Sequence, residues 1–213
     1  MTSRQAASPL RLTLTLTLLA ACLAGAWLLG REAYAPFDPA LMLGLHAHAT
    51  PTLTTLMTVV THSASSVVTV ILVVAGAALL WVRGQRRNAV ALVLGVALAS
   101  LLGEGLKLLV QRPRPDLFPH LVHAGGWSYP SGHTRNAVVV YGLLAWLAGP
   151  QEAGWRRALV RAAALVWAGL VALSRVYLGV HYPSDVLASL LLGIPWVLGV
   201  VWLSAPKPRV RRQ

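Results

Sequence analysis

The chain contains 213 residues, of which 56% are hydrophobic and only 11% are charged, a composition typical of membrane proteins and not of soluble domains. The formal net charge of +12 would suggest nucleic-acid binding in a soluble protein, but an excess of Lys and Arg in cytoplasmic loops explains such a charge in a membrane protein. The single cysteine, Cys22, excludes an intramolecular disulfide and cysteine-based catalysis at the polar segments described below.

The first apolar run, residues 12–30, follows Arg4 and Arg11 and is about as long as a helix that spans a bilayer. A cleaved signal peptide is the alternative, since Leu19-Ala20-Ala21-Cys22 has the form of a lipoprotein cleavage box behind a basic start. We favour an uncleaved helix, because the apolar run continues through residues 23–29 and does not turn polar after the cysteine.

Residues 31–65 have a mixed composition. Phe37-Asp38-Pro39 can start a helix, and Leu41, Met42 and Leu45 follow at helical spacing. This pattern predicts a short amphipathic helix that lies in the membrane interface.

Three histidines, His46, His48 and His62, lie in the same segment. A metal site is one interpretation, but His46 and His48 are two residues apart and would not share a helix face. No Cys or carboxylate completes a ligand set. We therefore expect solvated histidines at the interface and no bound metal.

The remaining chain contains five further apolar runs that predict spanning helices. They cover residues 67–82 (extended outward by residues 53–60), 88–110, 134–148, 162–173 with its flanks, and 186–203. Near the end of the third span, Glu104 and Lys107 are three residues apart and should be neighbours on one helix face. The loop of residues 111–129 is rich in Pro and Gly and will not continue that helix.

The distribution of Lys and Arg predicts how these spans are oriented. With the N-terminus in the cytoplasm, twelve of the 18 basic residues fall on the cytoplasmic side, including the tail of residues 207–212, and five fall on the opposite side. We therefore expect an all-α, polytopic bundle of six transmembrane helices with both termini in the cytoplasm. Because the cytoplasmic charge is divided among four separate segments, nucleic acid is not expected as a partner.

Three polar segments then lie on the external face, namely residues 107–115, 130–133 and 174–185. They bring together Lys107, Arg114 and Arg175, with Arg112 close by, although cations beside hydrocarbon are costly. Forked guanidinium donors match phosphate oxygens, and Lys adds a compact charge, so a phosphate or pyrophosphate is the expected ligand.

The second segment, Pro130-Ser131-Gly132-His133, opens a helix. Ser131 can cap this helix, Gly132 lets a ligand approach the backbone, and free amides at a helix N-terminus attract anions. A Ser-Gly-His helix start alone does not indicate a function, so its interpretation depends on the other two polar segments.

The third segment supplies a nucleophile. Pro183 is expected in the first turn of the last helix with Tyr182 extended before it, so that His181 and Asp185 bridge a loop and a helix start. If Asp185 accepts a proton from one imidazole nitrogen, the other nitrogen of His181 is free to attack phosphorus. His133 would protonate the leaving oxygen. The alternative is that both histidines only cap helices.

The order and spacing of these residues resemble the three-part signature of the type 2 phosphatidic acid phosphatase (PAP2) superfamily. Six residues separate Lys107 from Arg114-Pro115, and Pro130-Ser131-Gly132-His133 follows. In the third segment, five residues separate Ser174-Arg175 from His181, and three residues separate His181 from Asp185. The resemblance implies one domain over residues 1–213 with the family's six-helix plan, and a metal-independent phosphatase without a cofactor. It assigns His181 as the nucleophile, Asp185 as the residue that orients it, His133 as the general acid, and Lys107, Arg114, Ser131, Gly132 and Arg175 as the phosphoryl ligands.

Three further charged residues fall outside the signature. Arg112 is expected either as a second phosphate contact or as a lipid headgroup contact. Arg135 follows Ser131 by four residues and could bind a second phosphate, or it could pair with Glu104 or a helix end.

The expected substrate is therefore a lipid phosphate or diphosphate in the outer leaflet of the cell membrane, hydrolysed at the external or periplasmic face. Undecaprenyl diphosphate, phosphatidic acid and phosphatidylglycerophosphate are the favoured lipids, and dephosphorylation of lipid A or transfer of the phosphoryl group to another lipid remains open. Two alternatives come from other classes: a non-catalytic binder or carrier of lipid phosphates, and a vanadate-dependent oxidase that uses the same anion pocket.

Overall fold

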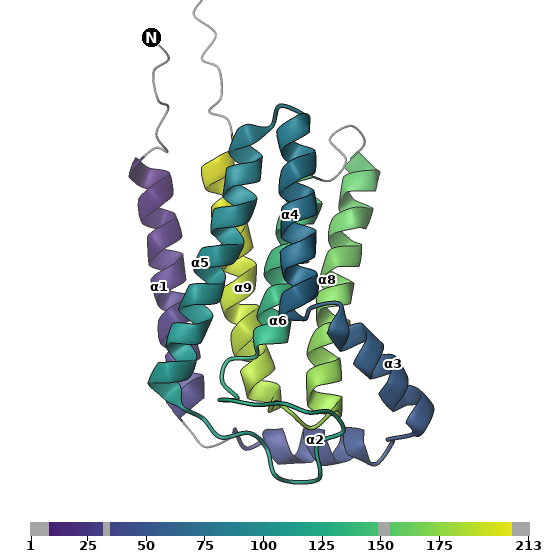
Figure 1. Ribbon diagram of the computed structural model, residues 1–213. Helices are drawn as coiled ribbons and strands as arrows, with labels where there is room; N and C mark the ends of the chain where they lie inside the picture. Colours follow the sequence, from purple (N-terminus) through teal and green to yellow (C-terminus); the bar gives the residue numbers. More distant parts are fainter. Residues whose placement is uncertain (1–8, 32–34, 149–153, 206–213) are drawn as a thin grey trace, which may run out of the picture.

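The computed structural model describes residues 9–31, 35–148 and 154–205, and every regular element within these ranges is a helix, as the sequence predicts. Five long helices lie side by side in a bundle (Figure 1). They are α1 (Pro9–Arg31), α4 (Ser66–Val82), α5 (Arg86–Val110), α8 (Gly154–Tyr177) and α9 (Pro183–Ser204).

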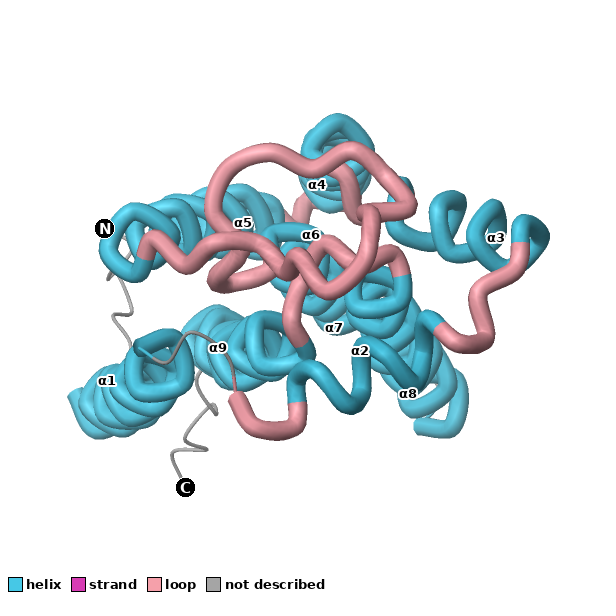
Figure 2. The backbone as a smooth tube through the Cα atoms, turned by 90° about the horizontal axis from the view of Figure 1, so that it is seen from below, coloured by secondary structure: helices cyan, strands magenta, loops and turns pink. Residues whose placement is uncertain are grey.

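One end of the bundle is closed by two shorter helices and a long loop. Helix α2 (Asp38–His46) lies across this end, and α3 (Pro51–His62) slopes outward beside α8. The loop of residues 111–131 passes over the same end (Figure 2). Because α5 and α8 end here and α9 begins here, the fold brings all three polar segments to one place.

A helix divided into three parts runs through the centre of the bundle. It consists of α6 (Gly132–Asn136), a π-helical turn η1 (Ala137–Tyr141) and α7 (Gly142–Leu147). The π-helical turn packs against α5, α8 and α9, and Val139 in it is 1% exposed. Such turns often lie near functional sites, and this one begins four residues after His133.

Helices α5, α8 and α9 are each long and apolar enough to cross a membrane. Helices α3 and α4 pass the same test together, but they are bent by 44° at a short break. The described residues therefore show three candidate spans, or four if the bent pair counts as one, because the apolar part of α1, Thr15–Leu28, is shorter.

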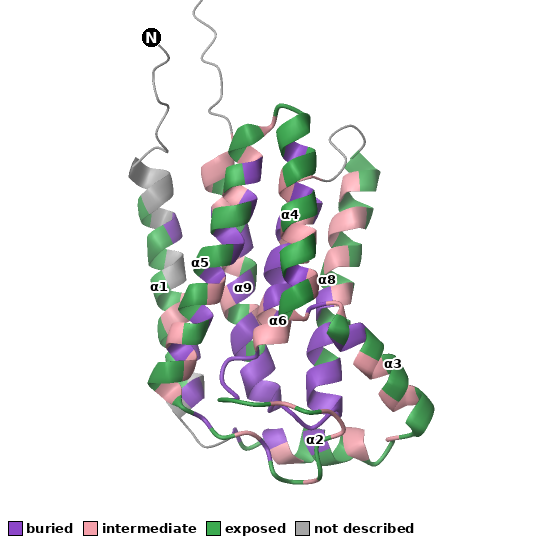
Figure 3. Ribbon diagram, viewed as in Figure 1, coloured by how far each residue is buried: buried purple, intermediate pink, exposed green. Residues whose placement is uncertain are grey.

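Apolar side chains cover the outside of the bundle. On α4, for example, Val67, Val70, Ile71 and Val74 are between 59% and 71% exposed. Buried residues instead gather in the ends of α8 and α9 nearest α2 (Figure 3). An exterior of this kind favours hydrocarbon, and together with the candidate spans it makes this a multi-pass membrane protein.

The predicted short helix is present as α2 and begins at Asp38 as expected. Its Met42 is fully buried against α8 and α9, whereas Leu41 and Leu43 are about half exposed. Helix α1 continues through Cys22 without a break. Arg4 and the basic tail of residues 207–212 lie outside the described residues.

Candidate active site

A polar cavity of about 350 Å³ lies at the closed end of the bundle. Of the residues that the signature picks out, six line it: Lys107, Arg114, Gly132, His133, Arg175 and His181. They come from α5, the long loop, α6, α8 and the turn before α9, which are distant in sequence. The cavity therefore assembles the cations and histidines that the sequence predicts on one face.

His181 is held between a carboxylate and a guanidinium group. Its Nδ1 lies 3.4 Å from Asp185 Oδ2, and its Nε2 lies 3.3 Å from Arg114 Nη1. Asp185 is the third residue of α9, Pro183 is the first, and Tyr182 is extended before them, as predicted. A proton on Nδ1 directed at Asp185 leaves the lone pair on Nε2, the nitrogen that lies beside Arg114.

Burial tunes His181 for this role. The side chain is nearly inaccessible, and this burial lowers the pKa of the imidazole to about 4, although the Asp185 carboxylate acts in the opposite direction. The imidazole is therefore neutral at physiological pH, which is the state that a nitrogen nucleophile requires.

Asp185 has no exposed surface, and four groups surround its carboxylate. Oδ2 accepts hydrogen bonds from Ser128 Oγ and, at 2.9 Å, from the backbone N–H of Tyr182, in addition to its contact with His181. Oδ1 accepts from Arg112 Nη1 at 2.6 Å. Ser128 carries no signal in the sequence, because it lies 57 residues before Asp185 in an irregular loop.

The position of Arg112 differs from both sequence-based expectations. Its side chain is 1% exposed and does not line the cavity. The guanidinium bridges Asp185 to Asp38 on α2, with Nη2 at 3.2 Å from Asp38 Oδ2, and it also donates to Ser184 Oγ at 2.8 Å. Two buried carboxylates need a buried cation, and Arg112 is committed to them and does not face the cavity.

The other cations of the signature face the cavity, and protein oxygens fix two of them. Arg114 donates to the carbonyl oxygens of Val180 at 2.6 Å and Gly125 at 2.7 Å. Arg175 is 4% exposed, donates to Thr61 Oγ1 at 2.9 Å, and keeps a buried Nε without a partner among the described residues. Both guanidinium groups are thus pre-positioned for an anion.

The entry to α6 has the predicted cap. Ser131 Oγ accepts from the backbone N–H of Thr134 at 3.5 Å and from its hydroxyl at 3.0 Å. Ser131 is fully buried and does not line the cavity, because its side chain turns back onto the helix. Gly132 does line it, and a Cβ there would lie 3.6 Å from Lys107 Nζ.

Of the three upstream histidines, His48 and His62 are exposed as expected, whereas His46 is half-buried. His62 lines the polar cavity, because α3 bends toward α4 just after it. His46 stacks on Phe118 with ring centroids 3.8 Å apart, and His48 Nδ1 lies 2.9 Å from the carbonyl oxygen of Gly44. Within residues 9–31, 35–148 and 154–205, no three His, Cys, Asp or Glu side chains are arranged to hold a metal ion.

Glu104, Lys107 and Arg135 form one ion-paired group at the rim of the cavity. Glu104 Oε1 lies 3.3 Å from Lys107 Nζ, as their spacing on the helix predicts. The same oxygen lies 3.4 Å from Arg135 Nη1, so the pairing of Arg135 with Glu104 is also present.

Sequence comparison decides the family. A profile of the PAP2 superfamily matches residues 88–209, which is more than half of the chain. The chain belongs to the PAP2 superfamily. The match includes all three polar segments and the helices that carry them.

The chain is similar to proteins from Bacillus subtilis and Sulfolobus acidocaldarius. Phosphatidylglycerophosphatase B of Bacillus subtilis is 37% identical over 147 residues, which are 68% of this chain and 71% of that protein. Undecaprenyl-diphosphatase of Sulfolobus acidocaldarius is 33% identical over 126 residues, which are 57% of each protein. The crystal structure of a transmembrane PAP2 type phosphatidylglycerolphosphate phosphatase from Bacillus subtilis has a TM-score of 0.77 and 32% identity, and the alignment covers 87% of this chain and 93% of that one.

Replacing Arg112 should destabilise the protein far more than the same replacement of Arg135. Arg112→Met leaves two carboxylates without their cation in a site that water does not reach, which should cost about 3–5 kcal/mol of unfolding free energy. Arg135→Met removes an ion pair with Glu104, whose side chain is 56% exposed, and a long contact of 3.4 Å with Asn136 Oδ1, and should cost about 1 kcal/mol. Thermal unfolding in detergent measures both, and equal losses would contradict a special role for the buried network.

Proposed function

We propose that this PAP2 protein is a membrane lipid phosphatase that works through a phosphohistidine on His181. The observation that carries the proposal is the imidazole whose Nδ1 faces a buried carboxylate, beside a cavity lined by Lys107, Arg114 and Arg175. Phosphate esters and anhydrides are the substrates that such a cluster of cations and a nitrogen nucleophile fit. The names of its relatives, all lipid phosphatases, support the same class.

In this mechanism His181 Nε2 attacks phosphorus while Lys107, Arg114 and Arg175 neutralise the phosphoryl oxygens. Positive charge that develops on the imidazole is stabilised by Asp185, which the buried ion pair with Arg112 holds in place. Burial, followed by the nearby Arg175, lowers the pKa of His133 to about 3. The negative charge of the bound phosphate raises this pKa, so that His133 can donate a proton to the leaving oxygen of the lipid. Water then hydrolyses the phosphohistidine and releases inorganic phosphate, with His133 accepting the proton of the water.

We further propose that the whole chain forms one domain with six transmembrane helices and cytoplasmic termini, with the cavity at the external face of the cell membrane. The distribution of Lys and Arg supports this orientation. The lipid would then approach from the outer leaflet, with undecaprenyl diphosphate, phosphatidic acid and phosphatidylglycerophosphate as candidate substrates.

The first prediction concerns the nucleophile. Purified protein in detergent should release phosphate from undecaprenyl diphosphate or phosphatidic acid with EDTA present, because none of the proposed steps uses a metal. His181→Ala should lose activity by at least about 10³-fold, since no other group replaces its nitrogen. Binding of both lipids without any phosphate release by the wild type would instead favour a binder or carrier, and peroxide-dependent halide oxidation in the presence of vanadate would favour an oxidase.

The second prediction concerns pH. Because the pKa of His181 is lowered to about 4, the nucleophile stays neutral down to about pH 5. After correction for the ionisation of the lipid phosphate, which is measured separately, the fall of kcat/KM at low pH that reports protonation of His181 should lie near pH 4. A corrected acid limb near 6.5 would indicate a solvated imidazole and contradict the buried site.

The third prediction concerns orientation. In a Cys22→Ser background, single cysteines at Asp116 in the loop over the cavity and at Gln85 in the turn between α4 and α5 lie at opposite ends of the bundle. A membrane-impermeant maleimide should label Asp116→Cys in intact cells and Gln85→Cys only after permeabilisation. The reverse pattern would place the cavity in the cytoplasm.

A further inference from the structure

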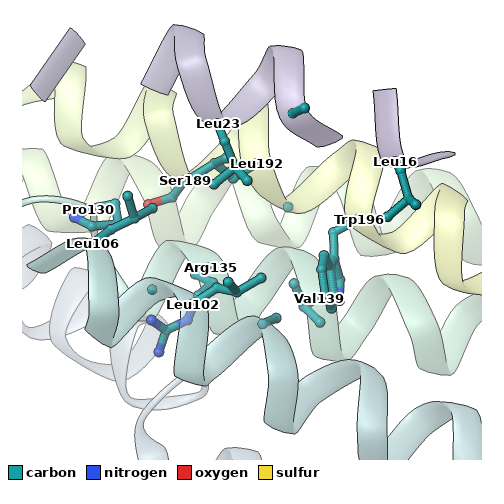
Figure 4. A pocket seen from close by; sticks show the side chains of 14 residues that line it. Leu16, Leu23, Leu102, Leu106, Pro130, Arg135, Val139, Ser189, Leu192 and Trp196 are labelled. Atoms are coloured by element: carbon teal, nitrogen blue, oxygen red, sulfur yellow. The ribbon is translucent and has the colours of Figure 1, made fainter. Parts of the chain in front are cut away.

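A second cavity lies beside the polar one and has a different chemistry. Its volume is about 460 Å³, and it lies between α1, α5 and α9. Apolar side chains such as Leu23, Leu106, Leu192 and Trp196 line it (Figure 4). Space of this kind suits a hydrocarbon chain.

Arg135 belongs to both cavities. Its side chain lines the apolar cavity among residues such as Leu102, while its guanidinium points away from them toward Glu104 and the polar cavity (Figure 4). Gly103 makes this path possible, because a Cβ at that position would lie 1.8 Å from Arg135 Nη1. The side chain thus has an apolar stem and a charged tip at the boundary of the two spaces.

The tip of Arg135 shares a carboxylate with a signature cation. Glu104 Oε1 contacts Lys107 Nζ at 3.3 Å and both terminal nitrogens of Arg135 at 3.4 Å. A Cβ on Gly132 would lie within 4 Å of Lys107 Nζ and of Arg135 Nη2, so both cations also approach the entry of α6. One carboxylate oxygen therefore occupies the place between two cations that an oxygen of a second phosphoryl group would fit.

The two partners of this ion pair differ in their freedom to move. The Arg135 side chain is 11% exposed, and its buried Nε has no partner in the described part of the chain. The Glu104 side chain is 56% exposed and can turn into water at little cost, because ion pairs with an exposed partner contribute little. An incoming anion can thus replace Glu104 without moving Arg135.

We propose that Arg135 binds the second phosphoryl group of a lipid diphosphate, beside Lys107, which contacts both phosphoryl groups, and that Arg135 makes this enzyme prefer diphosphates to monophosphates. The proposal rests on the proposed phosphatase function. The terminal phosphoryl group lies at His181, the proximal one replaces Glu104 at Arg135, and the hydrocarbon chain continues into the apolar cavity. His181, Arg135 and the apolar cavity thus follow one another in the same order as the terminal phosphoryl group, the proximal phosphoryl group and the hydrocarbon chain of the lipid.

The chemical step balances with water as the only co-reactant. The Nε2–P bond to His181 forms as the bond between the terminal phosphorus and the bridging oxygen breaks. The electron pair of that bond stays on the bridging oxygen, which becomes part of the lipid monophosphate and takes a proton from His133. The oxygen of a water molecule then attacks phosphorus, the Nε2–P bond breaks with its electron pair returning to Nε2, a proton of the water passes to His133, and inorganic phosphate is released.

Matched lipids test the proposal, because each pair differs only by one phosphoryl group: undecaprenyl diphosphate against undecaprenyl monophosphate, and diacylglycerol diphosphate against phosphatidic acid. The measured quantity is the ratio of kcat/KM for the diphosphate to that for the monophosphate. Arg135→Gln should lower this ratio by about 10- to 100-fold, the effect of losing hydrogen bonds to a charged group. Glu104→Gln should not lower it, since the substrate displaces Glu104 in any case. Arg83→Gln, an exposed arginine at the far end of the bundle, is the charge-matched control.

Three results would overturn the proposal. The ratio could be unchanged in Arg135→Gln, it could fall equally in Arg83→Gln, or Arg135→Gln and Glu104→Gln could lower activity on both lipids alike, which would make the ion pair structural.

If the wild type hydrolyses neither lipid, the proposed function fails, and inorganic pyrophosphate tests the site separately. Pyrophosphate should then raise the melting temperature more than phosphate does in the wild type but not in Arg135→Gln, and equal effects in the two proteins would reject the site.

Discussion

A carboxylate without access to water imposes the strictest requirement in this structure. Asp185 is fully buried, and an unpaired charge in such a place is costly. The chain meets the requirement with Arg112 on one oxygen and with Ser128, the Tyr182 amide and His181 on the other. These groups come from the long loop and from the turn before α9, so the closed end of the bundle can form only when both segments are in place.

The network extends to α2 and gives that helix a role that its amphipathic pattern does not reveal. Asp38 accepts from Arg112 and from the backbone N–H of Ser184 at 2.8 Å, and it is fully buried like Asp185. Helix α2 is therefore fixed to the first turn of α9 by charge as well as by the packing of Met42. His181 therefore contacts a carboxylate, Asp185, that is fixed by Arg112 and, through Arg112, by Asp38 on α2. Such support limits rotation of the imidazole nucleophile.

Local sequence rules predicted those parts of the site whose partners are close in the chain. The cap at Ser131, the extended Tyr182 before Pro183, and the contact of Glu104 with Lys107 all depend on spacings of three residues or fewer. The long-range contacts had no such signal. Arg112 meets Asp38 and Asp185 across 74 and 73 residues, and His62 reaches the cavity only because of the bend between α3 and α4. The apolar run of residues 134–148 predicted a spanning helix but not its π-helical turn, because such a turn leaves no mark in an apolar run.

Two arginine–carboxylate pairs at the same end of the bundle illustrate how burial separates structure from binding. Arg112 and both of its carboxylates are at most 1% exposed, so breaking that arrangement would strand charges in a dry interior, and no substrate can compete for it. The pair of Arg135 and Glu104 uses the same chemistry, but its carboxylate is 56% exposed and loses little by turning into water. A guanidinium that is held in place beside a removable anion is suited to exchange that anion for a phosphoryl group. The exposure of the carboxylate, and not the identity of the residues, therefore determines which arginine supports the fold and which one is available to a ligand.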